Sequence, residues 1–360
     1  MSYLTDLSNF KEVEMKPRVV TLKDIARELN LSTSTVSRAL RDSYEISEKT
    51  KKKVLEYAKK HNYSPNQAAL NLRTKQTRSI GVIIPTIANS FFSEVIDGIE
   101  SIAFEKGYNV IITQTHESVK KEIDNIQYLY SRSIDGLLIS LSAETNDITH
   151  HKEIHKQGVP IVYFDRIAEE IDTHKVIVDN EAGAYKATMH LINSGFTRIA
   201  HLANVKYLSI TKARLGGYKK AMKEAGLPIP DHYIQFCPHG GLLQEEIETA
   251  IDNLLSSEEK PEAVFSVGGK LTSGCLRALK YRDIHVPEDM AMIGFSNSEL
   301  FDLFSPPLTV VRQPALEMGK VSTEMLLDLI ERKRPISEYK KVTLPTTMTI
   351  RDSTKLESKQ

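Results

Sequence analysis

The segment LSTSTVSRAL, residues 31–40, concentrates hydroxyl groups on a short stretch that also carries an apolar stripe. Its apolar residues fall at helical spacing, and Arg38 carries its only charge. Hydroxyl and guanidinium groups are suited to hydrogen bonds with phosphate oxygens and with the polar edges of bases. These residue types therefore favour contact with a nucleic acid. The hydroxyl-bearing positions are Ser32, Thr33, Ser34, Thr35 and Ser37.

Two short helices must position this segment. The first is predicted to begin at Thr21, because Asp24 three residues later completes a capping box. Asn30 tolerates the left-handed backbone of a tight turn, and Ser32 then caps a second helix. The pattern predicts a helix-turn-helix whose slim second helix enters a DNA major groove, with Arg41 also on its exposed face. The alternative is a helical hairpin whose Ser and Thr side chains only face solvent.

Charge is distributed unevenly along the 360 residues, although Lys and Arg balance Asp and Glu overall. Residues 19–78 contain 13 Lys and Arg against 6 Asp and Glu, so the rest of the chain carries the opposite excess. A third helix over residues 47–61 contributes many of these lysines. We expect most of them to face solvent and some to lie near phosphates. A basic module on an acidic body predicts a polyanion partner for the module alone.

Beyond residue 78, short apolar runs alternate with amphipathic stretches. Helices are predicted over residues 92–106, 120–132, 182–194 and 212–225. This alternation predicts parallel sheets with helices on both faces, and the number of runs indicates two similar lobes. The strand candidates are SIGVIIP, YNVIIT, DGLLIS, PIVYFD, KVIVDN, RIAHLA, AVFSV and AMIGF.

The sequence resembles the lac repressor family of bacterial transcription regulators. The segments VTLKDIARELNLSTSTVSRAL and YSPNQAALNLRTKQTRSIGVIIP carry the resemblance, which extends over nearly the whole chain after residue 18. It implies an α/β fold class, in which an N-terminal all-α helix-turn-helix head precedes a two-lobed, doubly wound effector domain like the periplasmic binding proteins. It also implies a sequence-specific regulator, usually a repressor, of genes for carbohydrate uptake or catabolism.

The resemblance assigns roles in DNA binding. Thr33 and Ser34 match base-reading positions, whereas Arg41 stands where the family often has Asn. Residues 65–74 match the family's hinge helix, which is too short to be stable alone and pairs with a second copy over the minor groove. Leu72 matches the leucine that wedges between base pairs, although an ordinary linker with a chance leucine is the alternative. The implied DNA-binding residues are Thr21, Ser32, Thr33, Ser34, Thr35, Ser37, Arg38, Arg41, Asn66, Ala69 and Leu72.

The resemblance also divides the chain into parts. The expected ranges are a loose leader at 1–18, the head at 19–63, the hinge and linker at 64–77, the effector-binding and dimerisation domain at 78–355, and a tail at 356–360. Within that domain the N-lobe is expected to comprise about 78–177 and 312–340, and the C-lobe about 178–311 and 341–355. The chain would cross between the lobes near Val178, Val311 and Lys340.

Parallel sheets bind ligands at the carboxyl ends of their strands, here in the cleft between the lobes. Arg214 matches the family's effector-binding arginine, whose rigid fork can hold two oxygens of a sugar or a carboxylate. Asp165 is the other principal candidate. Each candidate taken alone also fits the role of a structural cap or turn. The candidates are Gln114, Asp165, Arg166, Asp179, Arg214, Ser296 and Gln313, with Thr115, Asn180 and Asn297 beside them.

Two departures from the family bear on the ligand. Gly268 and Gly269 stand where the family usually has Asn-Asp, and Ser296 and Asn297 stand where it often has Asp-Asp. One wall of the cavity should therefore be shallow and lacking in charge. We expect an effector larger than a plain monosaccharide, such as an oligosaccharide or an acidic or phosphorylated sugar derivative.

Other motifs indicate no catalytic residues, cofactor or metal. His151 and His155 have the spacing of metal ligands on a helix, but they lack the His-Glu order of zinc hydrolases. We therefore expect solvent-exposed histidines. The segment VGGKLTS lacks the glycine spacing of a phosphate loop, and no nucleophile elbow is evident. These observations count against the alternative function, a sugar-handling α/β enzyme such as a kinase with a fused DNA-binding head.

Cellular context and partners are also predicted. Cys237 and Cys275 form no disulfide framework, which suits a reducing cytoplasm, and we expect both to fill the core. The sequence contains no run of about 18 apolar residues, and its start lacks the apolar core of a signal peptide. Neither a membrane protein nor a secreted solute receptor is expected. The expected partners are a pseudo-palindromic double-stranded DNA operator, a small-molecule effector and a second copy in a homodimer, since the tail is too short and polar for a tetramer-forming heptad repeat.

Overall fold

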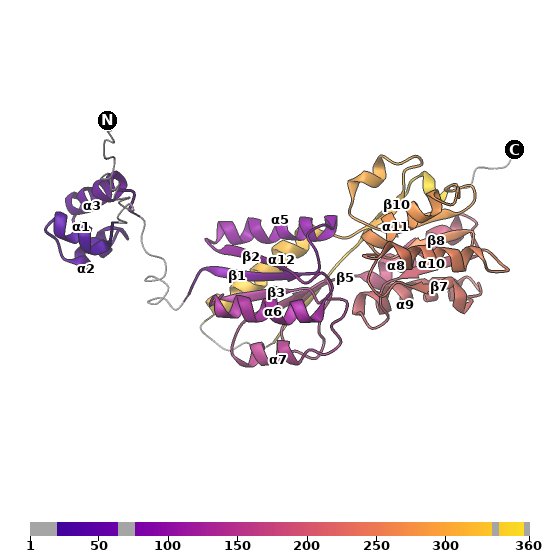
Figure 1. The fold of residues 1–360 in the computed structure, drawn as a ribbon, viewed down its shortest axis with the longest axis horizontal. Coiled ribbons are helices and arrows are strands. Elements are labelled where there is room, and N and C mark those ends of the chain that lie inside the picture. The colour runs from indigo at the N-terminus through magenta and orange to yellow at the C-terminus, as the bar shows by residue number, and fades with distance from the viewer. Residues whose placement is uncertain (1–19, 64–75, 333–337, 356–360) are drawn as a thin grey trace, which may run out of the picture. The chain divides into compact units, whose positions relative to one another are not determined.

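The computed structural model describes residues 20–63, 76–332 and 338–355. The expected leader and tail, and the hinge residues Asn66, Ala69 and Leu72, lie outside these ranges. The chain separates into two compact units, Met1–Lys75 and Gln76–Gln360, and each is described by itself (Figure 1). None of the helices in the described ranges has the length and apolar character needed to cross a bilayer.

Residues 20–63 of the first unit form three helices around a small core. They are α1 (Leu22–Glu28), α2 (Thr33–Ala39) and α3 (Glu48–Lys60). One residue of each helix, namely Ile25, Val36 and Val54, is completely buried where the helices meet. Because each helix has only seven to thirteen residues, this shared core rather than helix propensity holds the unit together.

Local signals in the sequence fix where these helices begin. Thr21 and Asp24 form the predicted capping box of α1, and the Ser32 hydroxyl accepts a hydrogen bond from the Thr35 amide at the start of α2. Asn30 has φ +52°, the left-handed conformation predicted for the tight turn. Ser47 caps α3 in the same way as Ser32 caps α2. The predicted helix-turn-helix is confirmed at the level of its backbone.

The N-lobe of the second unit is a six-stranded sheet in the order β11-β5-β4-β3-β1-β2, with neighbouring strands parallel. Helices α5 and α12 pack on one face and α6 and α7 on the other, each with its own buried core (Figure 1). The strands are β1 (Ser79–Ile84), β2 (Asn109–Gln114), β3 (Gly136–Ile139), β4 (Ile161–Phe164), β5 (His174–Val178) and β11 (Lys341–Leu344). The helices are α5 (Ser90–Glu105), α6 (Val119–Ser131), α7 (Thr149–Lys156) and α12 (Ala315–Glu331).

The C-lobe repeats this design with the order β12-β10-β9-β8-β6-β7, in which only β12 pairs antiparallel to its neighbour. Helices α8 and α9 cover one face, and α10 and α11 cover the other. The strands are β6 (Ile199–Ala203), β7 (Ile234–Phe236), β8 (Ala263–Ser266), β9 (Ala291–Phe295), β10 (Thr309–Arg312) and β12 (Thr347–Thr349). The helices are α8 (Asn180–Asn193), α9 (Ser209–Glu224), α10 (Gln244–Leu255) and α11 (Gly269–Lys280), with 3-10 turns at Asp231–Tyr233, Glu299–Asp302 and Asp352–Thr354.

The chain crosses between the lobes three times. It leaves the N-lobe after β5 at Val178 and returns after β10 at Arg312, close to the expected positions. The expected third crossing near Lys340 is wrong, because β11 pairs in parallel with β5 and so belongs to the N-lobe sheet. The crossing lies instead at residues 345–346, between β11 and β12. The N-lobe therefore extends to Leu344.

Candidate DNA-binding surface and effector cavity

Helix α2 presents two distinct faces. Val36 and Ala39 are buried against the neighbouring helices, while Thr33, Ser34 and Arg38 are exposed. A hollow in this outer surface is lined by Ser34, Ser37, Arg38, Arg41, Ser43 and Glu45. Four of the residues predicted to meet DNA, Ser34, Ser37, Arg38 and Arg41, therefore lie together on one outer surface of the head.

The hydroxyl groups at the start of α2 bond to one another as well as to the backbone. The Ser32 hydroxyl lies 2.7 Å from that of Ser34 and 2.8 Å from that of Thr35, and it caps the helix at the Thr35 amide. Thr35 is only half-exposed. Ser32 and Thr35 thus have a structural role in holding the helix start, whether or not they also contact a phosphate.

Both arginines of this surface have partners within the head. Arg38 Nη1 lies 3.1 Å from Glu45 Oε2. Arg41 donates to the Ser37 carbonyl at 3.0 Å and to the Ser37 hydroxyl at 2.7 Å, so it lies back along α2. Both side chains remain exposed, and each needs only to exchange a partner in order to reach a phosphate.

One lysine of α3 departs from the expectation that these lysines face solvent or phosphate. Lys51 is only 8% exposed, and its ammonium lies 2.7 Å from Asp42 Oδ1 and 2.8 Å from Glu48 Oε1. These bonds raise the pKa of Lys51 and tie the loop after α2 to the first turn of α3. Lys49, Lys52 and Lys53 stay exposed.

In the second unit, a cavity lies where the strands of both sheets end. Six of the effector candidates line it, whereas Gln114, Thr115, Asp179 and Asn180 do not. Gln114 instead accepts a hydrogen bond from the Ile87 amide, and Asp179 caps α8 at the Ala182 amide. Both residues thus act as a structural cap or turn, which was the alternative role for each candidate. The lining residues are Thr86, Asn89, Phe91, Phe92, Glu117, Asp165, Arg166, Asn204, Ile210, Arg214, Gly240, Leu242, Val267, Gly268, Gly269, Lys270, Phe295, Ser296, Asn297 and Gln313.

Arg214 is held rigidly in the wall of this cavity. It lies in the second turn of α9, is 3% exposed, and donates to Asn180 Oδ1 at 2.7 Å and to the Val267 carbonyl at 2.7 Å. Its remaining nitrogen donates to Gln313 Oε1 at 3.2 Å, and its guanidinium stacks 4.0 Å from the centroid of the Phe295 ring. Burial lowers the pKa of Arg214 to about 10, against the opposing effect of Asp165. The side chain remains a cation with a fixed orientation.

Asp165 brings an acceptor to the same cavity from the N-lobe. Its backbone has φ +57°, and its side chain is buried. Burial raises the pKa of its carboxyl group, while the charges of Arg166 and Arg214 oppose that rise. Within the described ranges its Oδ1 accepts no hydrogen bond. A buried acceptor of this kind is suited to the hydroxyl group of a ligand.

Several cavity residues escaped the sequence analysis. Glu117 follows β2 by three residues and binds Arg166 Nη1 at 2.6 Å, so it neutralises that cation. Asn204 follows β6 directly, which the strand-end rule could have identified. Lys270 lies in the first turn of α11, where the N-cap residue is Gly268 and supplies no capping side chain. The wall formed by the two glycines was expected to lack charge, and Lys270 shows that expectation to be wrong.

The glycines leave free space in that wall. A Cβ atom on Gly269 would lie 3.7 Å from Asn89 Oδ1 and 3.8 Å from Ser296 Oγ, and one on Gly268 would lie 3.6 Å from Leu271. Packing therefore does not require glycine at either position. Their effect is to widen the cavity beside Lys270.

Two hydrogen bonds join the lobes beside the cavity. Asn297 Nδ2 of the C-lobe donates to Glu94 Oε2 of α5 at 2.7 Å, and the Tyr207 hydroxyl donates to the Ala143 carbonyl. Burial raises the pKa of Glu94, and the bond from Asn297 opposes that rise. The cavity is thus bounded by contacts that hold the two lobes together.

The expectation that the histidines of α7 face solvent is wrong for His151. His151 is completely buried, with Nε2 2.8 Å from Glu122 Oε1 and Nδ1 2.9 Å from the Tyr163 hydroxyl. Its position explains the error, because His151 lies three residues from both Ile148 and Ile154 and shares their buried helix face. Cys237 and Cys275 are free thiols that are buried as expected.

Known families and proteins match both units. A model of the lacI family of bacterial regulatory proteins matches residues 21–66, and a periplasmic binding protein-like domain matches residues 188–354. The HTH-type transcriptional repressor PurR of Vibrio cholerae serotype O1 (strain M66-2) is 35% identical over 88% of this chain and 93% of its own length. Catabolite control protein A of Priestia megaterium is 34% identical over 93% of this chain and 99% of its own length.

A solved structure extends the likeness to three dimensions. The transcriptional regulator CelR in complex with cellobiose has a TM-score of 0.69 and 26% identity, over 93% of this chain and 99% of that one. By their names, the Vibrio cholerae protein is a transcriptional repressor and CelR is a transcriptional regulator. The chain therefore belongs to the lacI family of bacterial regulatory proteins, and it is a DNA-binding transcriptional regulator controlled by a small-molecule effector.

Proposed function

We propose that the protein is a homodimeric repressor that acts in the cytoplasm, binds a pseudo-palindromic operator and has no enzymatic activity. A single helix-turn-helix covers one half-site, so a two-fold symmetric pair of heads requires two related half-sites. The names of similar proteins support repression, since the Vibrio cholerae protein is a transcriptional repressor and a Haemophilus influenzae relative is a ribose operon repressor. The regulated genes are proposed to serve carbohydrate uptake or catabolism.

We further propose that the effector is an acidic or phosphorylated sugar derivative bound between the lobes. The charge of the cavity carries this proposal: three cations, Arg166, Arg214 and Lys270, line it against two carboxylates, Glu117 and Asp165. A lining with a net positive charge favours an anionic ligand.

Lys270 is the cavity cation whose charge has no partner within the described ranges, whereas Arg166 keeps an unpartnered Nε–H but has its charge paired. Arg166 is paired with Glu117, and Arg214 has bonded partners on all three nitrogens. Within the described ranges the Lys270 ammonium has no ion pair or side-chain hydrogen bond. It also stands in the first turn of α11, where the positive end of the helix dipole favours an anion. Asp165, with its open acceptor, is then suited to a sugar hydroxyl.

An uncharged oligosaccharide is the second candidate. The space left by Gly268 and Gly269 admits a second sugar ring, and Phe91, Phe92 and Phe295 offer apolar surface on which sugar rings pack. A structural neighbour of this chain was solved with cellobiose, a disaccharide. This candidate differs from the first in not requiring the charge of Lys270.

Calorimetry with gluconate, glucose 6-phosphate, cellobiose and glucose separates the two candidates. We expect an acidic sugar to bind most tightly, and Lys270→Gln to weaken it about tenfold to a hundredfold, the loss of one charge-assisted bond. Lys280→Gln removes the same charge from the exposed end of α11 and should leave the affinity unchanged. If cellobiose binds most tightly and Lys270→Gln leaves its affinity unchanged, the second candidate is established instead. If glucose binds as tightly as the tightest of the other three ligands, both candidate effector classes are refuted.

Footprinting tests the operator. We expect protection of two half-sites related by a pseudo-two-fold axis, and loss of binding as the salt concentration rises, because Lys and Arg displace counterions from phosphates. A single asymmetric half-site protected by one copy of the chain would contradict the proposed dimer.

A further inference from the structure

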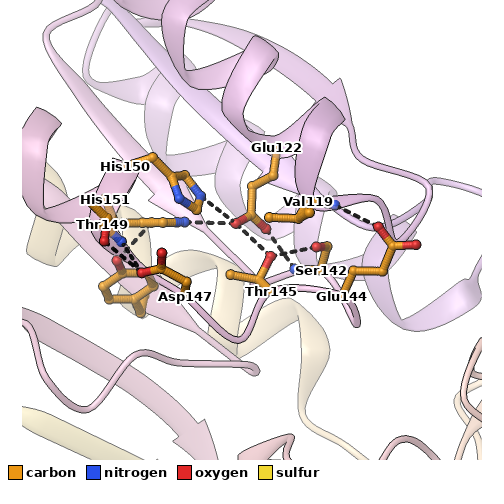
Figure 2. Close-up of polar contacts among 10 residues, drawn as sticks. Val119, Glu122, Ser142, Glu144, Thr145, Asp147, Thr149, His150 and His151 are labelled. Carbon is orange, nitrogen blue, oxygen red and sulfur yellow. Dashed lines mark hydrogen bonds and ion pairs between the residues drawn. The ribbon is translucent and has the colours of Figure 1, made fainter.

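A buried cluster of two histidines and a glutamate lies in the N-lobe and includes none of the residues that line the effector cavity. Glu122 belongs to α6, and His150 and His151 to the first turn of α7. The Nε2 atoms of His150 and His151 lie 3.0 Å and 2.8 Å from the same atom, Oε1 of Glu122. Figure 2 shows both rings on one side of the Glu122 carboxylate, with Ser142 and Thr145 on the other.

The convergence of two adjacent residues is unusual for a helix. Neighbouring side chains on a helix point in directions about 100° apart and do not normally meet. Here the two imidazole rings have centroids 4.2 Å apart, and their donor atoms and the carboxylate oxygen all lie within 4.8 Å of one another. Three potential metal-binding atoms are thus gathered at one point.

We propose that Glu122, His150 and His151 bind a divalent transition-metal ion, with Zn²⁺ as the preferred ion. Two imidazole nitrogens and one carboxylate oxygen form the ligand set that suits Zn²⁺, and three protein ligands leave a further position for water. Ligand atoms around tetrahedral Zn²⁺ lie about 3.3 Å apart. The two separations between a histidine Nε2 and Glu122 Oε1, 3.0 Å and 2.8 Å, therefore need to increase by only a few tenths of an ångström.

The surroundings of the cluster fit this role. The Tyr163 hydroxyl oxygen lies 2.9 Å from His151 Nδ1 and can accept a hydrogen bond from Nδ1–H, which orients the ring and directs Nε2 at the metal. The Ser142 amide donates to Glu122 Oε2 at 2.7 Å, and the Thr145 hydroxyl donates at 2.9 Å to Oε1, the oxygen that also faces the histidines, so both bonds fix the carboxylate. The His150 side chain is 13% exposed and gives an ion its route in from solvent, whereas Glu122 and His151 are fully buried.

The site is linked to the effector cavity by one short segment. Ser142, held by Glu122, precedes Ala143, whose amide donates to Glu117 Oε2 at 2.6 Å. Glu117 in turn pairs with Arg166 of the cavity, and the Ala143 carbonyl accepts the Tyr207 hydroxyl from the other lobe. A bound metal should therefore alter effector affinity; this consequence rests on the proposed effector site, whereas the metal site does not.

The test is competition for Zn²⁺ between the metal-free full-length protein and a chromophoric chelator. We expect one site per chain with a dissociation constant of about 1 μM or tighter. His150→Asn should weaken it at least tenfold, since loss of outer partners of a metal ligand alone costs about that much. His155→Asn is the matched control, because it removes another histidine of α7 outside the cluster, and it should retain the parent affinity.

Two further measurements distinguish a loss of metal binding from a loss of folding. Co²⁺ in place of Zn²⁺ should give visible absorption bands from a nitrogen- and oxygen-liganded site in the parent and in His155→Asn, but not in Glu122→Gln. The variants' far-ultraviolet circular dichroism in chelator should match the parent's. Equal Zn²⁺ affinity in the parent and His150→Asn, or no competition by the parent, would show a hydrogen-bonded cluster only and overturn the proposal. Zn²⁺ binding that leaves effector affinity unchanged would overturn only the coupling to the cavity.

Discussion

On the exposed face of α2, Arg38 already has an anionic partner before DNA arrives. Its guanidinium lies 3.1 Å from Glu45, and both side chains are about half exposed. An exposed pair of this kind contributes only about 0.2–1 kcal/mol, so a phosphate can displace Glu45 at little cost. Glu45 nevertheless brings a negative charge to the face that meets a polyanion. The pair is therefore expected to weaken DNA binding slightly and to orient Arg38.

Two substitutions at this pair test that account. Arg38→Ala should weaken binding to operator and unrelated DNA alike and reduce the salt dependence by about one ion, as expected for a phosphate contact. Glu45→Gln should strengthen binding to operator and to unrelated DNA by a few fold. Glu56→Gln, on the exposed surface of α3, is the control for the change in net charge. Fluorescence anisotropy at several salt concentrations measures these effects. If Arg38→Ala alters preference at one base position instead, the arginine contacts that base.

In the core of the C-lobe, His201 predicts a dependence of stability on pH. It is completely buried between Tyr218 and Phe265, and within the described ranges neither ring nitrogen has a hydrogen-bond partner. Burial, with smaller effects of Arg214 and Lys219, lowers its pKa from 6.5 to about 3. The unfolded chain therefore binds a proton that the fold excludes, and stability falls as the pH drops from 6.5 toward 3, by up to about 1.4 kcal/mol per pH unit.

His201→Phe removes the titrating group. Urea unfolding between pH 7 and pH 4 should show a shallower loss of stability in this variant than in the parent. The same loss in both proteins would mean that His201 is protonated, or paired with water, in the fold.

At the scale of elements, adjacent glycines in α9 have opposite surroundings. A Cβ atom on Gly217 would lie 2.2 Å from the Glu181 carbonyl oxygen of α8, so the two helices touch through their backbones there. Gly216 has open space around it. The close approach of α8 and α9 thus depends on one glycine and not on its neighbour.

The matched pair gives a prediction of opposite sign. Gly217→Ala should force α8 and α9 apart and destabilise the protein by about 1–3 kcal/mol. Gly216→Ala should stabilise it by about 0.5–1 kcal/mol through better helix propensity. Thermal or urea unfolding measures both, and equal effects of the two substitutions would rule out the backbone contact.

The elements also show what sequence patterns can and cannot predict. Continuous apolar runs such as SIGVIIP predicted the buried central strands, because burial on both faces leaves that pattern. The half-exposed edge strands β7 and β11 have no such run, which is why the third crossing was misplaced. Arg214 was found because it matches a family motif. Lys270 and Glu117 were missed because their roles depend on which loops the two sheets bring together.

For the whole molecule, effector control requires that ligand binding change how the lobes meet. The Tyr207 hydroxyl bonds the Ala143 carbonyl across the lobes, beside the Glu117 and Arg166 pair of the cavity. Asn297 and Glu94 form a second interlobe bond. A ligand that contacts both lobes adds to these contacts and favours the closed arrangement.

Loss of one interlobe bond should therefore weaken effector binding. Tyr207→Phe is expected to lower effector affinity by a few fold, about the value of one neutral hydrogen bond. Tyr185→Phe is the control, because the Tyr185 hydroxyl bonds Glu224 within the C-lobe. Calorimetry with the tightest-binding sugar of the panel measures both. An equal loss in the two variants would indicate a general effect on the C-lobe instead.

The most direct test of the central claim is the operator affinity of the parent with and without the acidic sugar that binds most tightly. At a saturating concentration, this ligand should shift the operator dissociation constant of the parent and of Lys280→Gln by about fivefold or more, the usual range of allosteric coupling. At a concentration just sufficient to saturate the parent, Lys270→Gln should show a clearly smaller shift, because loss of the cation lowers its occupancy by the ligand. A ligand response that survives Lys270→Gln in full, or ligand binding without any change in operator affinity, would contradict control through this cavity.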